Sequence, residues 1–325
     1  MDKQQDTDLL KARSYRRVLT VGFRTFTEHF RAFFKASWQM ALLYAITCGA
    51  LGTLTAIRIP ELTTAIMQQV TAYQGVYIEP LLQYSSSILV LLLLLLLSIT
   101  TLSLGSATIL AKLKEHKDTG CISTPPSWLT ANPRLMGRTL KGVFATLMVA
   151  LLPFLLVLAL IVVIVKTQPD MLHGRLITAL TTAFIMCVVT AALALPLMHV
   201  LMKYIMEPPC SFWKTLRKHY SSGMRHWGML FLVFFVSTLT VQLVQLVVML
   251  PAHILNIASQ TAYLGLLKGD PLGMPSYINT LTFVTFTLCC FIAFYVSQVM
   301  LVHNYYAYGA IEAKEQERKE LEINI

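Results

Sequence analysis

The sequence predicts an all-α polytopic membrane protein, in which six transmembrane helices form three hairpins and amphipathic helices lie on the cytoplasmic face. Of the 325 residues, 56% are hydrophobic and only 13% are charged, whereas a soluble domain carries about 25% charged residues. Six stretches contain no Asp, Glu, Lys or Arg, and each has the roughly 20 residues that a helix needs to cross a bilayer. They lie near residues 37–57, 86–111, 143–165, 176–202, 229–256 and 280–305.

The distribution of basic residues predicts the orientation. Four segments, 1–36, 112–141, 203–225 and 306–325, contain 22 of the 26 Lys and Arg residues. Because basic loops remain in the cytoplasm, we expect a multi-pass protein of the cytoplasmic (inner) membrane with both termini inside. The chain then divides into a cytoplasmic leader (1–36), a transmembrane domain (37–305) and a charged cytoplasmic tail (306–325). The net charge of +10 favours contact with anionic lipid headgroups and requires no nucleic acid.

The segment Phe23–Trp38 has an amphipathic pattern and leads directly into the first uncharged stretch. On a helix, its five phenylalanines fall in one arc and four of its charged residues fall on the opposite side. This pattern is typical of a helix that lies in a membrane interface with its aromatic face toward the acyl chains. Docking of a partner membrane protein and a site for one lipid headgroup are the alternatives. The predicted interfacial anchors are Phe23, Phe26, Phe30, Phe33, Phe34 and Trp38.

Small residues in the first two spans predict close helix packing. Gly49 and Gly52 lie on a stripe that carries nothing larger than a methyl group, and Gly105 lies on a similar stripe of the second span. Because small residues let another helix approach closely, we expect these three glycines to face neighbouring helices. Arg58 and Pro60 are expected to end the first span.

A second amphipathic segment, residues 211–227, again precedes an uncharged stretch. Phe212, Tyr220 and Trp227 share one helical face there and are further predicted anchors. A shift of 189 residues places Phe23 on Phe212. This similarity predicts three repeated units, each with an inner-surface segment followed by a membrane hairpin. Chance or shared interface chemistry would produce the same similarity, so the residues leave both explanations open.

The fifth uncharged stretch carries three polar residues, Gln242, Gln245 and His253, on one side of the expected helix. They could line a path for a substrate or a proton, since polar residues inside membranes face the bundle interior. They could also form hydrogen bonds between helices, worth about 0.6 kcal/mol each. No ionisable carboxylate or basic group accompanies them within the stretch, and we therefore favour hydrogen bonding.

Signatures of catalysis are missing from the sequence. It contains no HExxH, no GxSxG and no phosphate-binding glycine loop. Its six cysteines form no CxxC motif and do not pair with histidine at the spacing of metal ligands. We therefore expect no catalytic residue, no metal and no cofactor, and a protein that is not an enzyme.

Residues 211–236, SFWKTLRKHYSSGMRHWGMLFLVFFV, carry a resemblance to a known group. An aromatic and basic inner helix that leads into a span is similar to bacterial six-helix integral membrane proteins, including the membrane domain of some glycerophosphodiester phosphodiesterases. The phosphodiesterase catalytic domain is absent, so the resemblance implies no activity. It implies a non-enzymatic protein of a bacterial cytoplasmic membrane that maintains the envelope through lipid or partner-protein contacts. The alternative is a small permease or channel with a polar path near Gln242 and Gln245.

Overall fold

The computed structural model is helical almost throughout its described residues. Six helices are long and apolar enough to cross a membrane, which confirms the predicted all-α polytopic class. They are α2 (Phe30–Tyr73), α4 (Ser85–Thr119), α5 (Pro133–Thr167), α6 (Leu172–Met206), α8 (Trp227–Leu267) and α9 (Tyr277–Ile323). Two shorter helices, α1 (Tyr15–Glu28) and α7 (Phe212–Arg225), directly precede α2 and α8. The structure describes residues 9–73, 84–120, 122, 133–167, 172–207, 210–269, 275 and 277–323.

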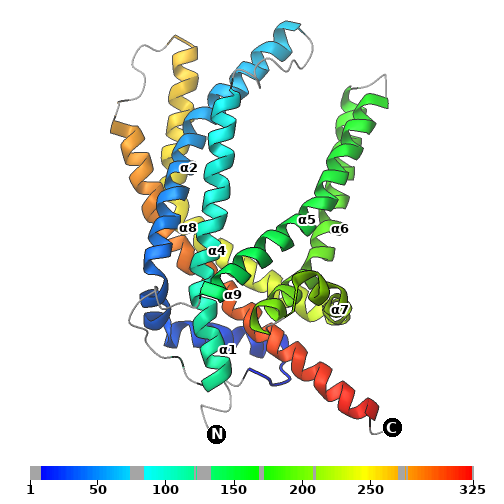
Figure 1. Ribbon diagram of the computed structural model, residues 1–325. Helices are drawn as coiled ribbons and strands as arrows, with labels where there is room; N and C mark the ends of the chain where they lie inside the picture. The colour runs from blue at the N-terminus through cyan, green and yellow to red at the C-terminus, as the bar shows by residue number, and fades with distance from the viewer. Residues whose placement is uncertain are drawn as a thin grey trace.

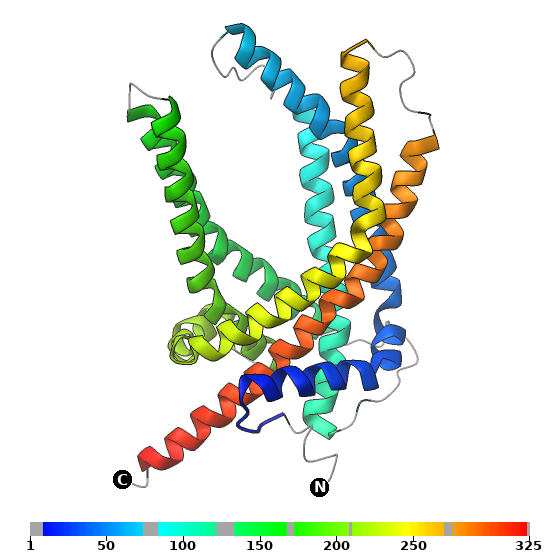
Figure 2. The same cartoon turned by 180° about the vertical axis from the view of Figure 1, so that it is seen from behind.

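Consecutive long helices pack in three pairs, α2 with α4, α5 with α6 and α8 with α9 (Figure 1). Because α9 also packs along α2, the first and third hairpins form one block of four helices. The α5–α6 hairpin contacts this block through α4, α8 and α9, and it diverges from the block toward the other end (Figure 2). The end at which α1, α7 and the C-terminal part of α9 lie is named the basic end, because it gathers basic segments of the sequence (Figure 1).

Both ends of α2 differ from the expected helix. It begins at Phe30 and so contains part of the segment predicted to lie in the interface. It also continues through Pro60 to Tyr73, where the sequence predicts a break. Arg58 pairs with Glu61 at 2.8 Å across the proline, and two threonine hydroxyls donate to the proline carbonyl. The helix continues through Pro60 without a break, as proline-containing membrane helices can when neighbouring helices pack around them.

The glycines of the first hairpin lie against α9. A Cβ added at Gly49 would overlap an α9 side chain, and a Cβ at Gly52 would come within 2.5 Å of the ring of Phe286. At Gly105 the added atom would lie 2.7 Å from the ring of Phe294. All three glycines therefore face α9, and their lack of a side chain permits this close approach.

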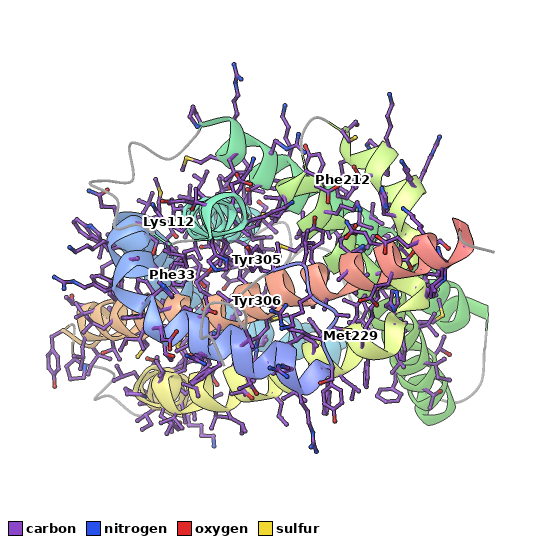
Figure 3. The ribbon with its side chains drawn as sticks, turned by 90° about the horizontal axis from the view of Figure 1, so that it is seen from below. Phe33, Lys112, Phe212, Met229, Tyr305 and Tyr306 are labelled. Carbon is purple, nitrogen blue, oxygen red and sulfur yellow. The ribbon has the colours of Figure 1, made fainter. Side chains whose placement is uncertain are left out.

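The largest buried side chains belong to the part of α9 at the basic end. Tyr305 and Tyr306 are fully buried, and Tyr308 is 1% exposed. Figure 3, viewed onto the basic end, shows Tyr305 and Tyr306 at the centre of the molecule. The sequence predicts a separate charged tail from residue 306, but α9 continues unbroken to Ile323. Small residues lie next to these tyrosines and let neighbouring helices approach, so this part of α9 is packed inside the protein.

α1 and α7 have matching boundaries. Each is 14 residues long, follows a serine and ends at a histidine, after which the chain enters a long helix. Tyr15 corresponds to Phe212 and His29 to His226, a constant shift of 197 residues. The aromatic spacing of the sequence predicts a shift of 189, so the helix boundaries correct the register. A histidine ends each short helix, and the two histidines therefore define the register of the repeat more reliably than the aromatic rings do.

Each short helix lies across the second helix of another hairpin. α7 packs on α6, from the hairpin that precedes it, and α1 packs on α9, from the last hairpin. Both contacts use a glycine, since Gly22 of α1 faces His303 and Gly223 of α7 faces Pro196. Each of the two short helices that the structure describes therefore packs on the hairpin before its own, and for α1, the first in the chain, the last hairpin takes that place. The matching inner segment of the middle unit, before α5, falls outside the described residues.

Candidate functional site

A groove of about 450 Å³ lies where α7 crosses the α5–α6 hairpin. We name it the α7 groove. Tyr220 of α7 donates a hydrogen bond of 2.9 Å to the carbonyl of Leu193 on α6, and this bond holds the two sides of the groove together. Apart from Thr190, its polar residues come from α7. The lining residues are Val149, Ala150, Thr190, Leu193, Ala194, Leu197, Leu216, Arg217 and Tyr220.

A second groove, of about 440 Å³, lies where α1 crosses the α8–α9 hairpin. We name it the α1 groove. Aromatic rings form much of its wall, and Phe34 stacks on Tyr295 with ring centroids 5.2 Å apart. None of its lining residues is charged. They are Phe23, Phe26, Phe30, Phe34, Thr240, Val241, Val244, Phe291, Ile292, Tyr295, Val296 and Val299.

The two grooves occupy equivalent positions in the repeat. In the register of 197 residues, Phe23 of α1 corresponds to Tyr220 of α7, and each lines its groove. The chemistry diverges at a neighbouring position, where Thr20 corresponds to Arg217. The Thr20 hydroxyl donates to a carbonyl of its own helix at 3.0 Å, whereas Arg217 reaches its groove. Only the α7 groove therefore carries a cation among its lining residues.

Exposed cations continue beside the α7 groove. Lys214, Arg217 and Lys218 are exposed, and their spacing places them on one side of α7. Among the residues that the structure describes, none of the three pairs with a carboxylate. On α1, by contrast, Arg24 pairs with Glu28 at 2.9 Å. The α7 groove is thus bordered by positive charge that the described residues leave unneutralised.

Charged side chains at the basic end join α6 to α9. Lys203 Nζ lies 2.6 Å from the Glu312 carboxylate, with side chains only 11% and 13% exposed. His199 Nε2 lies 3.4 Å from the same carboxylate, and the Tyr308 hydroxyl donates to Glu207. Because buried charges are tolerated when they are paired, this cluster binds α6 to α9 without leaving free charge inside the protein.

Glu315 joins α9 to α7. Its carboxylate lies 3.1 Å from Arg225 and 3.2 Å from His226. Burial lowers the pKa of His226, and the neighbouring Glu315 opposes this shift only in part. Burial, followed by the positive charge of Lys203, lowers the pKa of His219 on the same helix. Both histidines are therefore neutral at pH 7, and Arg225 supplies the positive charge of the contact.

Neutral hydrogen bonds occur where α1 meets α9. Thr25 and Tyr306 share a buried hydrogen bond of 2.8 Å between their hydroxyls. Next to the glycine of α1, His303 shares a hydrogen bond of 2.8 Å with Ser237 of α8. α1 is thus attached to α9 by shape and neutral hydrogen bonds, whereas α6 and α7 are attached to it by ion pairs.

The predicted interfacial anchors divide into two groups. Phe26, Phe33 and Phe212 are buried inside the protein, which corrects the expected contact of these three rings with lipid. Phe26 and Phe33 are buried because the helix breaks at His29. The break turns Phe33 into the bundle, where its ring stacks on the ring of Phe26. Phe212 packs instead on the ring of Tyr204. The exposed or half-exposed anchors are Phe23, Phe30, Phe34, Trp38, Tyr220 and Trp227.

The predicted polar stripe lies on α8. Gln242 and His253 are exposed, and Gln245 is half-buried. Gln245 donates to the carbonyl of Ala293 on α9 at 3.3 Å, which is the kind of interhelical bond that the sequence favours. A surface hollow beside the stripe is lined by α8 residues alone. Within the described ranges, therefore, no second helix completes a polar path along these side chains.

The buried charges and the α7 groove are not evident from the sequence. Lys203 follows an uncharged stretch and Glu312 falls in a charged tail, so that both are expected in water. The sequence contains one signal. Small residues continue as far as Ala313, and the polar residues Tyr308, Glu312 and Glu315 lie among and after them at helical spacing. That pattern is typical of a helix face that packs against other helices. The groove needs three helices together, and no local pattern indicates it.

Both grooves are suited to binding hydrocarbon. Their volumes fall in the range of about 300–1,000 Å³ that is typical of ligand sites, and their walls are mainly apolar. Among the described residues, no group of three or more His, Cys, Asp or Glu is placed to hold a metal ion. A scan against protein-family models, a search of curated proteins and a search of solved structures each found no match to this chain.

Proposed function

We propose that this protein is a non-enzymatic component of a bacterial cytoplasmic membrane that maintains the envelope through contacts with lipid or a partner membrane protein. The observation that best supports this function is the pair of equivalent apolar grooves beneath α1 and α7. The resemblance in layout to bacterial six-helix membrane proteins supports the location. The 22 of 26 basic residues in alternate segments support an orientation with the basic end in the cytoplasm.

The grooves support a lipid-contacting function because of where they occur. Each lies where a short amphipathic helix crosses the second helix of a hairpin. Amphipathic helices of this kind lie at the boundary between headgroups and acyl chains. A groove at that depth lies beside the headgroups and the first part of the acyl chains. Its apolar wall can therefore hold an acyl chain without exposing the chain to water.

A small permease has less support. Its polar path would pass Gln242 and Gln245, but Gln242 is exposed and Gln245 bonds to a neighbouring backbone carbonyl. The buried charges that a transporter could use, Lys203 and Glu312, are neutralised by each other at the basic end. They therefore support the attachment of helices more than the movement of an ion.

Gene deletion with rescue tests the proposal. Loss of the protein should increase the entry of a membrane-impermeant dye into cells, and wild-type protein should restore the barrier. The double variant Gln242→Leu with Gln245→Leu should restore it equally well, whereas Ala194→Phe, which fills the α7 groove, should not. Immunoblots must show equal amounts of each variant. Rescue by Ala194→Phe combined with failure of the double variant would contradict the proposal and favour a permease.

A further inference from the structure

We propose that the α7 groove binds one anionic phospholipid from the leaflet at the basic end. An acyl chain occupies the apolar groove, and the lipid phosphate binds Arg217. This inference rests on the proposed function, in which the protein acts through lipid contacts, and it adds the class of lipid and the residues that select it. Three observations support it: the depth of the groove, the charge at its rim and the contrast with the α1 groove.

The depth of the groove matches the headgroup level. The uncharged part of α6 from residue 176 to Leu193 spans 18 residues, which at 1.5 Å per residue corresponds to about 27 Å. The hydrocarbon core of a bilayer is about 30 Å thick. Since Tyr220 fastens α7 to the carbonyl of Leu193, α7 lies where this span leaves the hydrocarbon, and its side chains lie beside the lipid phosphates.

The charge at the rim matches a phosphate. Arg217 lines the groove while it remains exposed, so its guanidinium can reach an anion without a cost in desolvation. Guanidinium binds phosphate oxygens through two parallel hydrogen bonds. Lys214 and Lys218 flank it on the same helix, and none of the three has a carboxylate partner in the part of the chain that the structure describes. The rim is therefore complementary to an anionic headgroup.

The α1 groove provides the internal comparison. It has nearly the same volume and an equivalent position, but all its lining residues are uncharged. Thr20, which corresponds to Arg217, bonds to its own helix. A hydrocarbon chain should therefore enter either groove, whereas a preference for anionic lipid should arise only at α7. This difference separates recognition by Arg217 from the general attraction of a basic protein for an anionic membrane.

Native mass spectrometry of the full-length protein, released from detergent with added phosphatidylglycerol or phosphatidylethanolamine, tests the site. Both lipids carry a phosphate, but the ammonium group of phosphatidylethanolamine neutralises its headgroup and is repelled by Arg217. Wild-type protein should therefore bind one phosphatidylglycerol about fivefold more tightly than phosphatidylethanolamine, equivalent to about 1 kcal/mol. Arg217→Gln should abolish this preference. Lys214→Gln removes the same charge from the same helix outside the groove and should leave most of it. Ala194→Phe should reduce binding of phosphatidylglycerol by filling the groove, while circular dichroism confirms an unchanged helix content.

Several results would overturn the assignment. Equal losses in Arg217→Gln and Lys214→Gln would show a general surface attraction, and unchanged binding in Ala194→Phe would place the chain elsewhere. Displacement of the lipid by millimolar glycerol phosphate or inorganic phosphate would show a site for free anions. The two proposals can fail separately. If the lipid binds as expected but deletion leaves the envelope intact, the proposed function is wrong and the site remains.

Discussion

α1 and α7 occupy equivalent positions in the repeat, yet the contacts around them differ in chemistry. Both helices have the same length, the same preceding serine and the same terminal histidine. α1 is held by a neutral hydrogen bond between Thr25 and Tyr306 and borders an uncharged groove. α7 is held by the ion pair of Arg225 with Glu315, and Arg217 lines its groove.

The comparison separates what local sequence determines from what the neighbours determine. The boundaries of a short helix depend on residues within it and directly beside it, and the two helices keep the same length and the same flanking residues. The residues that face the groove and α9 depend on the partner helix, and these have diverged. One backbone arrangement can therefore present a neutral surface in one copy and a basic surface in the other.

The largest expected effect concerns the charged attachment of α6. Glu312→Gln leaves the nearly buried Lys203 with only the exposed carboxylate of Glu207, 3.8 Å away, and we expect the free energy of unfolding to fall by up to about 3–5 kcal/mol. Unfolding in mixed detergent micelles measures this change. The double variant Lys203→Met with Glu312→Leu should recover much of the loss, because neither charge is then left unpaired. Glu322→Gln, an exposed carboxylate on the same helix, is the control and should have little effect.

A smaller effect is expected where α1 and α7 meet α9. Thr25→Val removes the buried hydrogen bond to the Tyr306 hydroxyl and should reduce stability by up to about 3 kcal/mol. Arg225→Gln breaks an ion pair whose arginine is 46% exposed, and should reduce stability by less than about 1 kcal/mol. Thermal unfolding in detergent compares the two. A larger loss for Arg225→Gln would reverse the comparison and make charge the stronger attachment.

The last effect concerns the glycines beneath the two short helices, where two opposing contributions to stability partly cancel. A Cβ at Gly22 would lie 2.5 Å from the buried ring of His303, whereas a Cβ at Gly223 would lie 3.0 Å from Pro196. Alanine gains about 1 kcal/mol over glycine in a helix, and overpacking costs about 1–3 kcal/mol. We therefore expect Gly22→Ala to reduce stability by up to about 2 kcal/mol and Gly223→Ala to be close to neutral. Equal melting temperatures for the two variants would show that α1 is no more tightly packed than α7.

The number and hydrophobicity of the spans were predictable because both depend on composition within single windows. Helix boundaries were less predictable, and Pro60 shows why: α2 continues through this residue to Tyr73, because tertiary packing lets a membrane helix tolerate a proline. The pairing of Lys203 with Glu312 spans 109 residues, and the α7 groove needs α5, α6 and α7 together. Long-range contacts of this kind leave no mark in a single window, whereas the serine and histidine that bound each short helix do.

The position of α9 at the centre of the basic end has a consequence for biosynthesis. Thr25 on the first helix and its partner Tyr306 are 281 residues apart. At a synthesis rate of roughly 5–20 residues per second, α1 leaves the ribosome about 15–60 s before its partner exists. During that interval Val18 and Val21, which are buried in the finished protein, can be covered by the membrane surface. Because α1 is amphipathic, it can bind the membrane surface until α9 is synthesised, and insertion of α9 then completes the assembly.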